Sequence, residues 1–167
     1  MNGLEQVKSA LAAALERAGL PSLSAFPPGW AKAYSGPVAA VGLRMGESRS
    51  GSLGGYLGQR TDPETLENRE IYGMRLEMTL SLDLYSPPGS GAAGCDSALE
   101  ALHQAVLEGL PAGLRPAELK WEETVWDEDT QMFLRRGSLS CSAFFTAEAS
   151  EDGLALSDFI LKGLVTR

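Results

Sequence analysis

Few residues in this chain could carry chemistry. The sequence has one histidine, His103, and two cysteines, Cys95 and Cys141. A catalytic histidine needs a partner that exchanges its proton, and no residue pattern around His103 supplies one. A thiol near a helix start can have a lowered pKa and act as a nucleophile, which makes Cys95 the one candidate of this kind. We interpret all three as structural residues, two of them small partly buried thiols.

The densest group of carboxylates surrounds a predicted turn. Its members are Glu118, Glu122, Glu123, Asp127, Glu128 and Asp129. Hard cations prefer oxygen ligands, but Glu122 and Glu123 point to opposite faces of a strand, and the spacing is not that of an EF-hand. We interpret the group as a solvated acidic hairpin tip. The sequence therefore predicts no catalytic residue, no metal ligand and no cofactor-binding residue, and no cofactor.

Glycines and serines gather between Gly46 and Asn68. A phosphate-binding loop would need a lysine after the last glycine and a helix behind it, and this stretch has neither. We expect a long flexible loop at about 46–68, of a length that is usually functional or disordered. Tyr56 and Leu57 interrupt its polar run. They predict either a contact with a partner or a segment that tucks back onto the domain.

Length and composition limit the class of protein in which these residues act. The 167 residues fit one domain, with 44% hydrophobic and 22% charged residues. A formal net charge of −8 argues against direct nucleic-acid binding, which needs Lys and Arg to displace counterions. No apolar run reaches the roughly 20 residues that cross a bilayer, and the N-terminus lacks the apolar centre of a signal peptide. We expect a cytosolic protein without a disulfide.

The clearest structural signal is the run RLEMTLSLDLY from Arg75 to Tyr85. Apolar side chains occupy every even position from Leu76 to Leu84. Charged or small polar side chains occupy the odd positions Arg75, Glu77, Thr79, Ser81 and Asp83. Strict alternation predicts a strand with one buried and one polar face, which Ile71 to Gly73 would extend.

Two amphipathic helices accompany this strand. Apolar residues recur at spacings of three and four in Leu4 to Ala18 and again in Asp96 to Glu108. Gly and Pro follow each segment, as they commonly follow a helix. We expect Asp96 or Ser97 to cap the second helix.

The remaining segments read as strands. Pro37 to Met45 predicts one strand, and Leu119 to Val125 with Met132 to Thr146 predicts a hairpin across an acidic turn. Leu23 to Phe26 and Leu156 to Leu161 predict short strands. Together these elements predict a single α+β domain over 1–167, with one mostly antiparallel sheet and two helices packed on one face.

This arrangement leaves one face of the long strand without a covering helix. We expect Arg75, Glu77, Thr79, Ser81 and Asp83 to lie on that face, where they can be solvated or can meet another subunit through hydrogen bonds. Together with Tyr56 and Leu57 they are the candidate subunit or partner interface.

Part of the sequence resembles a family of phage proteins. Within Leu80 to Leu107 the segment LSLDLYSPPGSGAAGCDSALEALHQAV runs from strand through a Gly-rich loop to a helix, and LSDFILKG follows near the end of the chain. With the N-terminal helix and the hairpin, this order of elements is similar to tail-terminator or minor tail proteins of long-tailed phages, of the type found in prophages of Gram-positive bacteria. The stretch from Gly46 to Asn68 matches least.

The resemblance implies a virion structural protein that is not an enzyme. Such a subunit would form a homo-oligomeric ring, a hexamer, on the tail tube, stop tube polymerisation and join the tail to the head connector. Its partners would be itself, the tail tube protein and the connector protein. Its location would be the host bacterial cytoplasm during assembly and then the virion tail.

Three other readings stay open at this stage. One is a neighbouring head–tail connector or completion protein. Another is a small cytosolic enzyme that uses the acidic hairpin or Cys95, which would need a deep pocket around one of them. The third is an adaptor that binds a peptide along a sheet edge.

Overall fold

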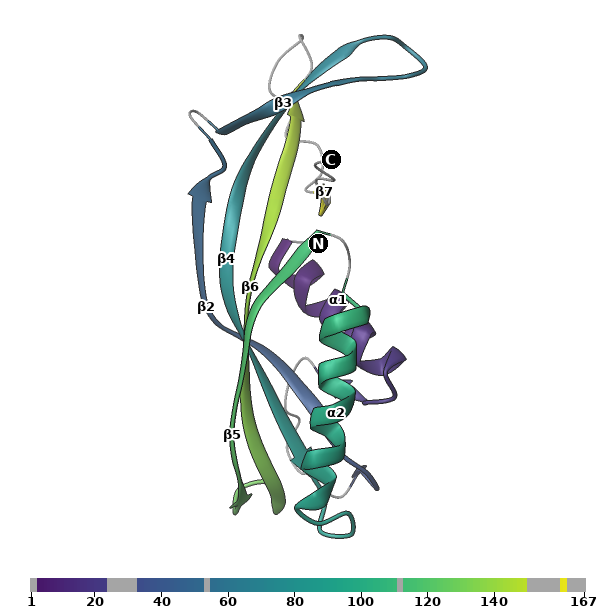
Figure 1. The fold of residues 1–167 in the computed structure, drawn as a ribbon, viewed down its shortest axis with the longest axis vertical. Helices are drawn as coiled ribbons and strands as arrows, with labels where there is room; N and C mark the ends of the chain where they lie inside the picture. Colours follow the sequence, from purple (N-terminus) through teal and green to yellow (C-terminus); the bar gives the residue numbers. More distant parts are fainter. Residues whose placement is uncertain (1–2, 24–32, 53–54, 111–112, 150–159, 162–167) are drawn as a thin grey trace.

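The computed structural model describes residues 3–23, 33–52, 55–110, 113–149 and 160–161. Its elements follow in the order α1 (Gly3–Arg17), β1 (Ser22–Leu23), β2 (Val38–Ser50), β3 (Tyr56–Thr61), β4 (Asn68–Ser86), α2 (Ala93–Glu108), β5 (Leu114–Asp127), β6 (Met132–Ala149) and β7 (Ile160–Leu161). Figure 1 shows one long, twisted sheet with both helices on the same side of it. The predicted α+β class, with a mostly antiparallel sheet and two helices on one face, is confirmed.

The sheet is organised around β4. Its main path runs β1-β2-β4-β6-β5, and β3 and β7 pair with the far ends of β4 and β6. All pairings are antiparallel except that of β1 with β2. The predicted hairpin is present as β5 and β6, both longer than expected. Since β4 pairs on both sides along most of its length, it is the central strand of the sheet.

Alternation in β4 has the predicted consequence. Leu76, Met78, Leu80, Leu82 and Leu84 are all at most 5% exposed. They form one core cluster with Val7, Leu11, Ala14 and Leu15 of α1, Ala98, Leu102, Ala105 and Val106 of α2, and Leu139, Cys141 and Ala143 of β6. The even face of β4 is therefore the floor on which both helices pack, as the sequence predicts.

Both helices lie where the periodicity places them, but the predicted cap of α2 is wrong. The helix begins three residues early, at Ala93, and Ala92 in the N-cap position makes no side-chain cap hydrogen bond. Ser86 instead donates to the Gly91 carbonyl in the preceding turn at 2.7 Å. Asp96 lies inside the first turn and pairs with Arg135.

The predicted loop at 46–68 is corrected by strand pairing. β2 continues to Ser50, and β3 resumes the same line at Tyr56, so both pair with the single strand β4. The segment is the outgoing side of a long hairpin, and its turn spans Asp62 to Glu67. We call the part that extends beyond the helices, residues 56–72, the arm (Figure 1).

A second, smaller core lies on the opposite face of the sheet. Val38, Ala40, Tyr85, Met132 and Leu134 are buried there, with Leu23 and Tyr34 packed against them. Burial raises the pKa of Tyr85 to about 12. The odd face of β4 is thus covered at its lower end, beyond Asp83.

The short predicted strands fall partly within the described residues. Leu23 belongs to β1, and Ile160 and Leu161 form β7, whereas residues 24–26 and 156–159 lie outside the described part of the chain. None of the described helices is long and apolar enough to cross a membrane.

Candidate functional site

The odd face of β4 is the candidate site, and the helices lie on its other side (Figure 1). The side chains of Arg75 and Glu77 are 52% and 44% exposed. Thr79 and Ser81 are half-buried between their neighbours on the adjoining strands. The structure therefore places all five predicted residues, Arg75 to Asp83, on one shared face.

Strand register adds two residues that the sequence did not suggest. Arg49 of β2 lies directly opposite Arg75, and Glu47 lies opposite Glu77. The face thus carries a row of two arginines beside a row of two glutamates, which we call the charged rows. Both Arg49 and Glu47 fall in the segment read as a loop, so only the register could have revealed them.

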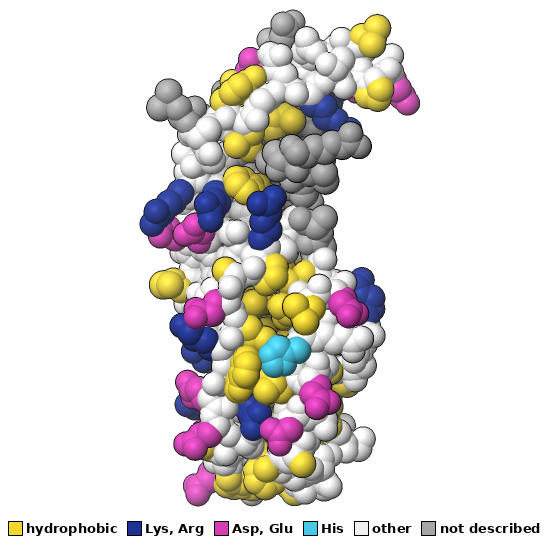
Figure 2. Space-filling view, in the orientation of Figure 1, with side chains coloured by type: hydrophobic (Ala, Val, Ile, Leu, Met, Phe, Trp, Pro, Cys, Tyr) yellow, Lys and Arg dark blue, Asp and Glu magenta, His cyan; other side chains and the backbone are white. Residues whose placement is uncertain are grey.

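Ion pairs along each strand hold the charged rows together. Arg75 Nη2 lies 3.0 Å from Glu77 Oε1. Arg49 makes two hydrogen bonds to the Glu47 carboxylate, both at 3.0 Å. The bond from Arg49 is the main reason that the pKa of Glu47 is lowered. Figure 2 shows cationic and anionic side chains side by side on the side of the sheet away from the helices.

Like charges face each other across the two strands, whereas opposite charges face each other along each strand and on the diagonal from Arg49 to Glu77. Like charges directly opposite each other on neighbouring strands repel and destabilise a sheet. The pairs Arg49–Arg75 and Glu47–Glu77 both have this arrangement. The ion pair within each strand and the attraction between Arg49 and Glu77 offset this repulsion. The charged rows therefore present a fixed order of exposed charges to any surface that meets this face.

Below the charged rows the face is lined with small hydroxyl side chains. Thr79 pairs with Ser140, and Ser81 pairs with Ser138. Gly42 lies opposite Ser81, and a Cβ at Gly42 would approach the Ser81 hydroxyl to 2.5 Å. Met45 lies opposite Thr79 and is 69% exposed, so one large apolar side chain stands beside these short ones. The hydroxyls can both donate and accept hydrogen bonds.

Asp83 ends the polar face. Its Oδ1 lies 3.9 Å from Arg44 and has no hydrogen-bond partner among the described residues. Burial raises the pKa of Asp83, while the Gly137 backbone N–H and the cations Arg44 and Arg136 oppose that rise. A partly buried carboxylate with a spare acceptor atom suits a hydrogen bond from a partner.

The two apolar candidates of the arm have different environments. Tyr56 is 40% exposed and packs edge to face against Tyr72, with ring centroids 5.6 Å apart. Leu57 is half-buried over the backbone of Gly51 and Gly73. Leu57 therefore tucks back onto the sheet, and only Tyr56 presents a large surface.

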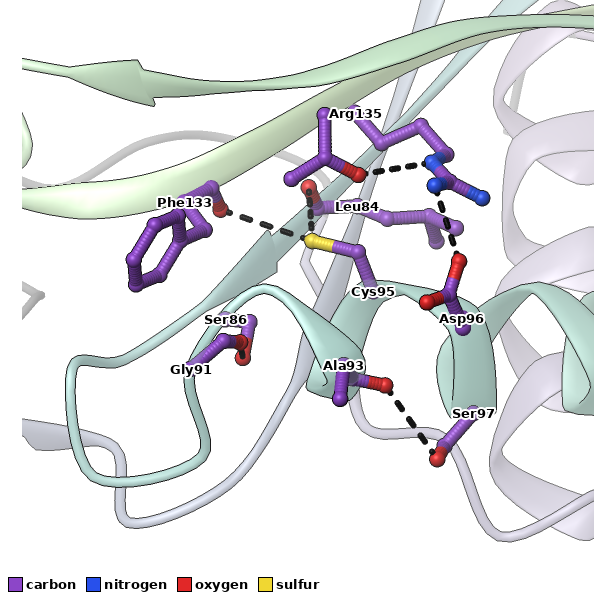
Figure 3. Close-up of polar contacts among 10 residues, drawn as sticks. Leu84, Ser86, Gly91, Ala93, Cys95, Asp96, Ser97, Phe133 and Arg135 are labelled. Atoms are coloured by element: carbon purple, nitrogen blue, oxygen red, sulfur yellow. Dashed lines mark hydrogen bonds and ion pairs between the residues drawn. The ribbon is translucent and has the colours of Figure 1, made fainter.

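Cys95 lies in the first turn of α2 and faces Leu84 of β4 and Phe133 of β6 (Figure 3). The residue is 0% exposed, and its Sγ lies 3.8 Å from the Leu84 carbonyl oxygen and 3.7 Å from that of Phe133. Burial raises the pKa of Cys95, and burial raises that of Cys141 to about 11. Both thiols are free, protonated at neutral pH and enclosed, which does not suit a nucleophile.

His103 has an aromatic partner that the sequence did not suggest. Its ring meets Trp121 of β5 at right angles, with centroids 4.9 Å apart. Figure 2 shows the histidine among apolar side chains between β5 and α2. His103 is half-buried, so its place at the edge of the core is as expected.

The acidic residues spread over the outer hairpin. Glu118 pairs with Lys120 at 2.9 Å, and Asp127 accepts hydrogen bonds from the Thr130 backbone and hydroxyl in the turn. Glu122 and Glu123 lie at a register shift between Trp121 and Thr124. Within the described residues, no group of three or more His, Cys, Asp or Glu side chains could hold a metal ion.

No protein-family model matches this chain, and no curated protein matches its sequence.

Proposed function

We propose that the protein is a structural subunit of a phage tail that acts as a tail terminator. In this proposal it assembles with copies of itself into a ring, a hexamer, on the end of the tail tube. The ring stops tube polymerisation and offers a surface to the head connector. The resemblance of the segment from Leu80 to Leu107 and the order of elements suggest this class.

The charged rows carry the proposal. Two like-charge pairs are kept side by side on a sheet face that the helices leave open. Complementary charges across an interface fix register and suppress wrong partners more than they add affinity. Subunits of a ring meet through two different surfaces, so the charged rows would face another surface of the next copy or the end of the tube.

A row exchange tests the proposal without disturbing the fold. The variant carries Glu47→Arg, Arg49→Glu, Arg75→Glu and Glu77→Arg. It keeps the net charge and allows one ion pair within each strand, as in the natural protein. It reverses only the order of charge that a partner meets. We expect a ring of several subunits by light scattering for the natural protein and a loss of that ring for the variant, with an unchanged melting temperature.

A matched control is the single substitution Glu123→Arg on the exposed outer hairpin. It changes the charge but lies away from the charged rows. We expect this variant to assemble normally. A natural protein that stays monomeric up to its solubility limit, or a row-exchange variant that assembles as before, would contradict the proposal.

A further inference from the structure

The arm ends in a leucine that is held in an unfavourable conformation. Leu66 has a φ of +58°, in the left-handed region where a residue with a branched side chain is uncommon. Glycine or asparagine is the ordinary choice at such a position. Leu66 is also 77% exposed, so its side chain gains little from its own chain.

The turn around Leu66 is tightly built. Asp62 Oδ1 accepts hydrogen bonds from the backbone N–H groups of Glu64 and Thr65, at 2.9 and 3.3 Å. The Leu66 N–H donates to the Asp62 carbonyl at 2.9 Å, and the Asp62 N–H donates to Glu67. Arg69 lies 3.7 Å from the Asp62 carboxylate. These bonds fix the direction in which the leucine points before any partner binds.

A hollow with a partly apolar lining lies between the two helices. Its volume is about 440 Å³, and its lining consists of Ala10, Ala13, Arg17, Glu108, Gly109 and Leu110. The alanines, glycine and leucine give it an apolar floor. Arg17 at its rim donates to the Gly109 carbonyl at 2.6 Å, which holds the guanidinium in place.

We propose that Leu66 of one copy inserts into the hollow between α1 and α2 of the next copy. The acidic residues beside Leu66, Glu64 and Glu67, would then have Arg17 as their counter-charge, while Glu108 is the acidic residue of the same lining. The arm and the hollow are different surfaces, so the contact is of the head-to-tail kind that closes a ring. Figure 1 places the arm beyond the helices along the long axis, so a second copy can meet it. This inference rests on the proposed self-assembly.

Substitution of Leu66 by asparagine separates this role from a structural one. Asparagine tolerates the left-handed conformation, so we expect the Leu66→Asn monomer to melt at the same or a higher temperature. Assembly should weaken roughly tenfold or more, as expected when a leucine is removed from a buried contact. A lower melting temperature, or unchanged assembly, would overturn the inference.

Cross-linking tests the hollow itself. Leu66→Cys protein is mixed with Ala13→Cys protein and mildly oxidised, and the dimer that joins the two is quantified. Cys95 and Cys141 are at most 4% exposed, so they give little background. The control mixes Leu66→Cys with Glu100→Cys, on an exposed position of α2 outside the hollow.

The outcomes are distinguishable from those of the row exchange. A 66–13 product several times more abundant than the 66–100 product supports the inference, and equal amounts overturn it. One result rejects this contact but keeps the proposed function. In it, Leu66→Asn assembles normally and the 66–13 and 66–100 products are equal, but the row exchange abolishes the ring. If the natural protein forms no ring and no 66–13 product, both fail.

Discussion

The two halves of β4 show how one strand can serve two purposes. From Leu76 to Leu84 it pairs with β2 and β6 and buries every even side chain beneath the helices. From Asn68 to Tyr72 it pairs with β3 and the end of β6. Met74, which lies just below and pairs with Ser50 of β2, is 47% exposed. The lower half is fixed by packing, whereas the upper half depends mainly on backbone pairing.

The difference indicates where folding ends and interaction begins. Burial of an apolar side chain stabilises the fold by roughly 1.5–3 kcal/mol, and the lower half has five such residues in a row. The arm has few buried side chains but has a rigid turn and exposed apolar residues, Tyr56 and Leu66. Residues that contribute little to folding yet are held in place are free to serve a partner.

The largest expected effect separates the two halves directly. Leu80→Ala removes a leucine that is 1% exposed and leaves a cavity between the sheet and the helices. We expect a loss of about 2–5 kcal/mol in the free energy of unfolding, measured by urea denaturation. The matched change at the lower edge of the arm, Met74→Ala, should alter it by less than about 0.5 kcal/mol. Similar losses for both variants would mean that the core continues up β4 to the edge of the arm.

Glycines test the same contrast through the backbone. A Cβ at Gly137 would lie 2.7 Å from the Leu82 carbonyl oxygen, and one at Gly73 would lie 2.5 Å from that of Phe145. We expect Gly137→Ala to cost about 1–3 kcal/mol, since the core cannot shift to admit a methyl group. Gly73→Ala should lower global stability less and should instead speed amide exchange in β3, because the arm can open on its own.

A control keeps this test specific. At Gly36 an added Cβ would meet nothing within 4 Å, so Gly36→Ala should be nearly neutral. Hydrogen exchange followed by mass spectrometry would resolve β3 from the core. If Gly73→Ala lowered global stability as much as Gly137→Ala, the arm would not be an independent unit.

The same contrast explains what the sequence could predict. The lower half of β4 and both helices bury one face, so apolar residues recur with the period of their secondary structure. These elements, their layers and the polar odd face follow from that pattern. In the arm neither face is deeply buried, so no period marks β3, and its glycines are those of a loop.

Two residues of the candidate site could not be predicted from the sequence, for one shared reason. Glu47 and Arg49 join the site only because β2 pairs with β4 through a register shift between Leu43 and Met45. Cross-strand register depends on which strands become neighbours, and local sequence does not contain it. The predicted cap of α2 is wrong because the helix begins at Ala93, so Asp96 lies inside its first turn, where it pairs with Arg135 of β6.

An ion pair of the core half should have a smaller effect. Arg135 Nη2 lies 2.8 Å from Asp96 Oδ1, and the Arg135 side chain is 16% exposed (Figure 3). We expect Asp96→Ala to cost about 1 kcal/mol or less at low salt, and less again at high salt. Glu47→Gln, on an exposed pair in the charged rows, should leave the unfolding midpoint unchanged while it weakens assembly. A destabilising Glu47→Gln would assign the charged rows to folding.

The smallest expected effect concerns Asp83, where the polar face meets the lower core. Burial raises its pKa in the folded state, so the folded protein binds a proton more tightly there than the unfolded chain does. The stability contributed by this group is therefore highest below its unfolded pKa, and falls as the pH rises through its folded pKa. Asp83→Asn removes that loss and keeps an oxygen that can accept the Gly137 N–H. We expect the variant to be equally or slightly more stable at neutral pH, by less than about 1 kcal/mol, with the difference shrinking toward about pH 4.

The measurement is the free energy of unfolding of Asp83→Asn and of the natural protein at these two pH values. A variant less stable at neutral pH would show that the attraction of Arg44 and Arg136 outweighs the cost of burial, and that Asp83 belongs to the fold rather than to the interface.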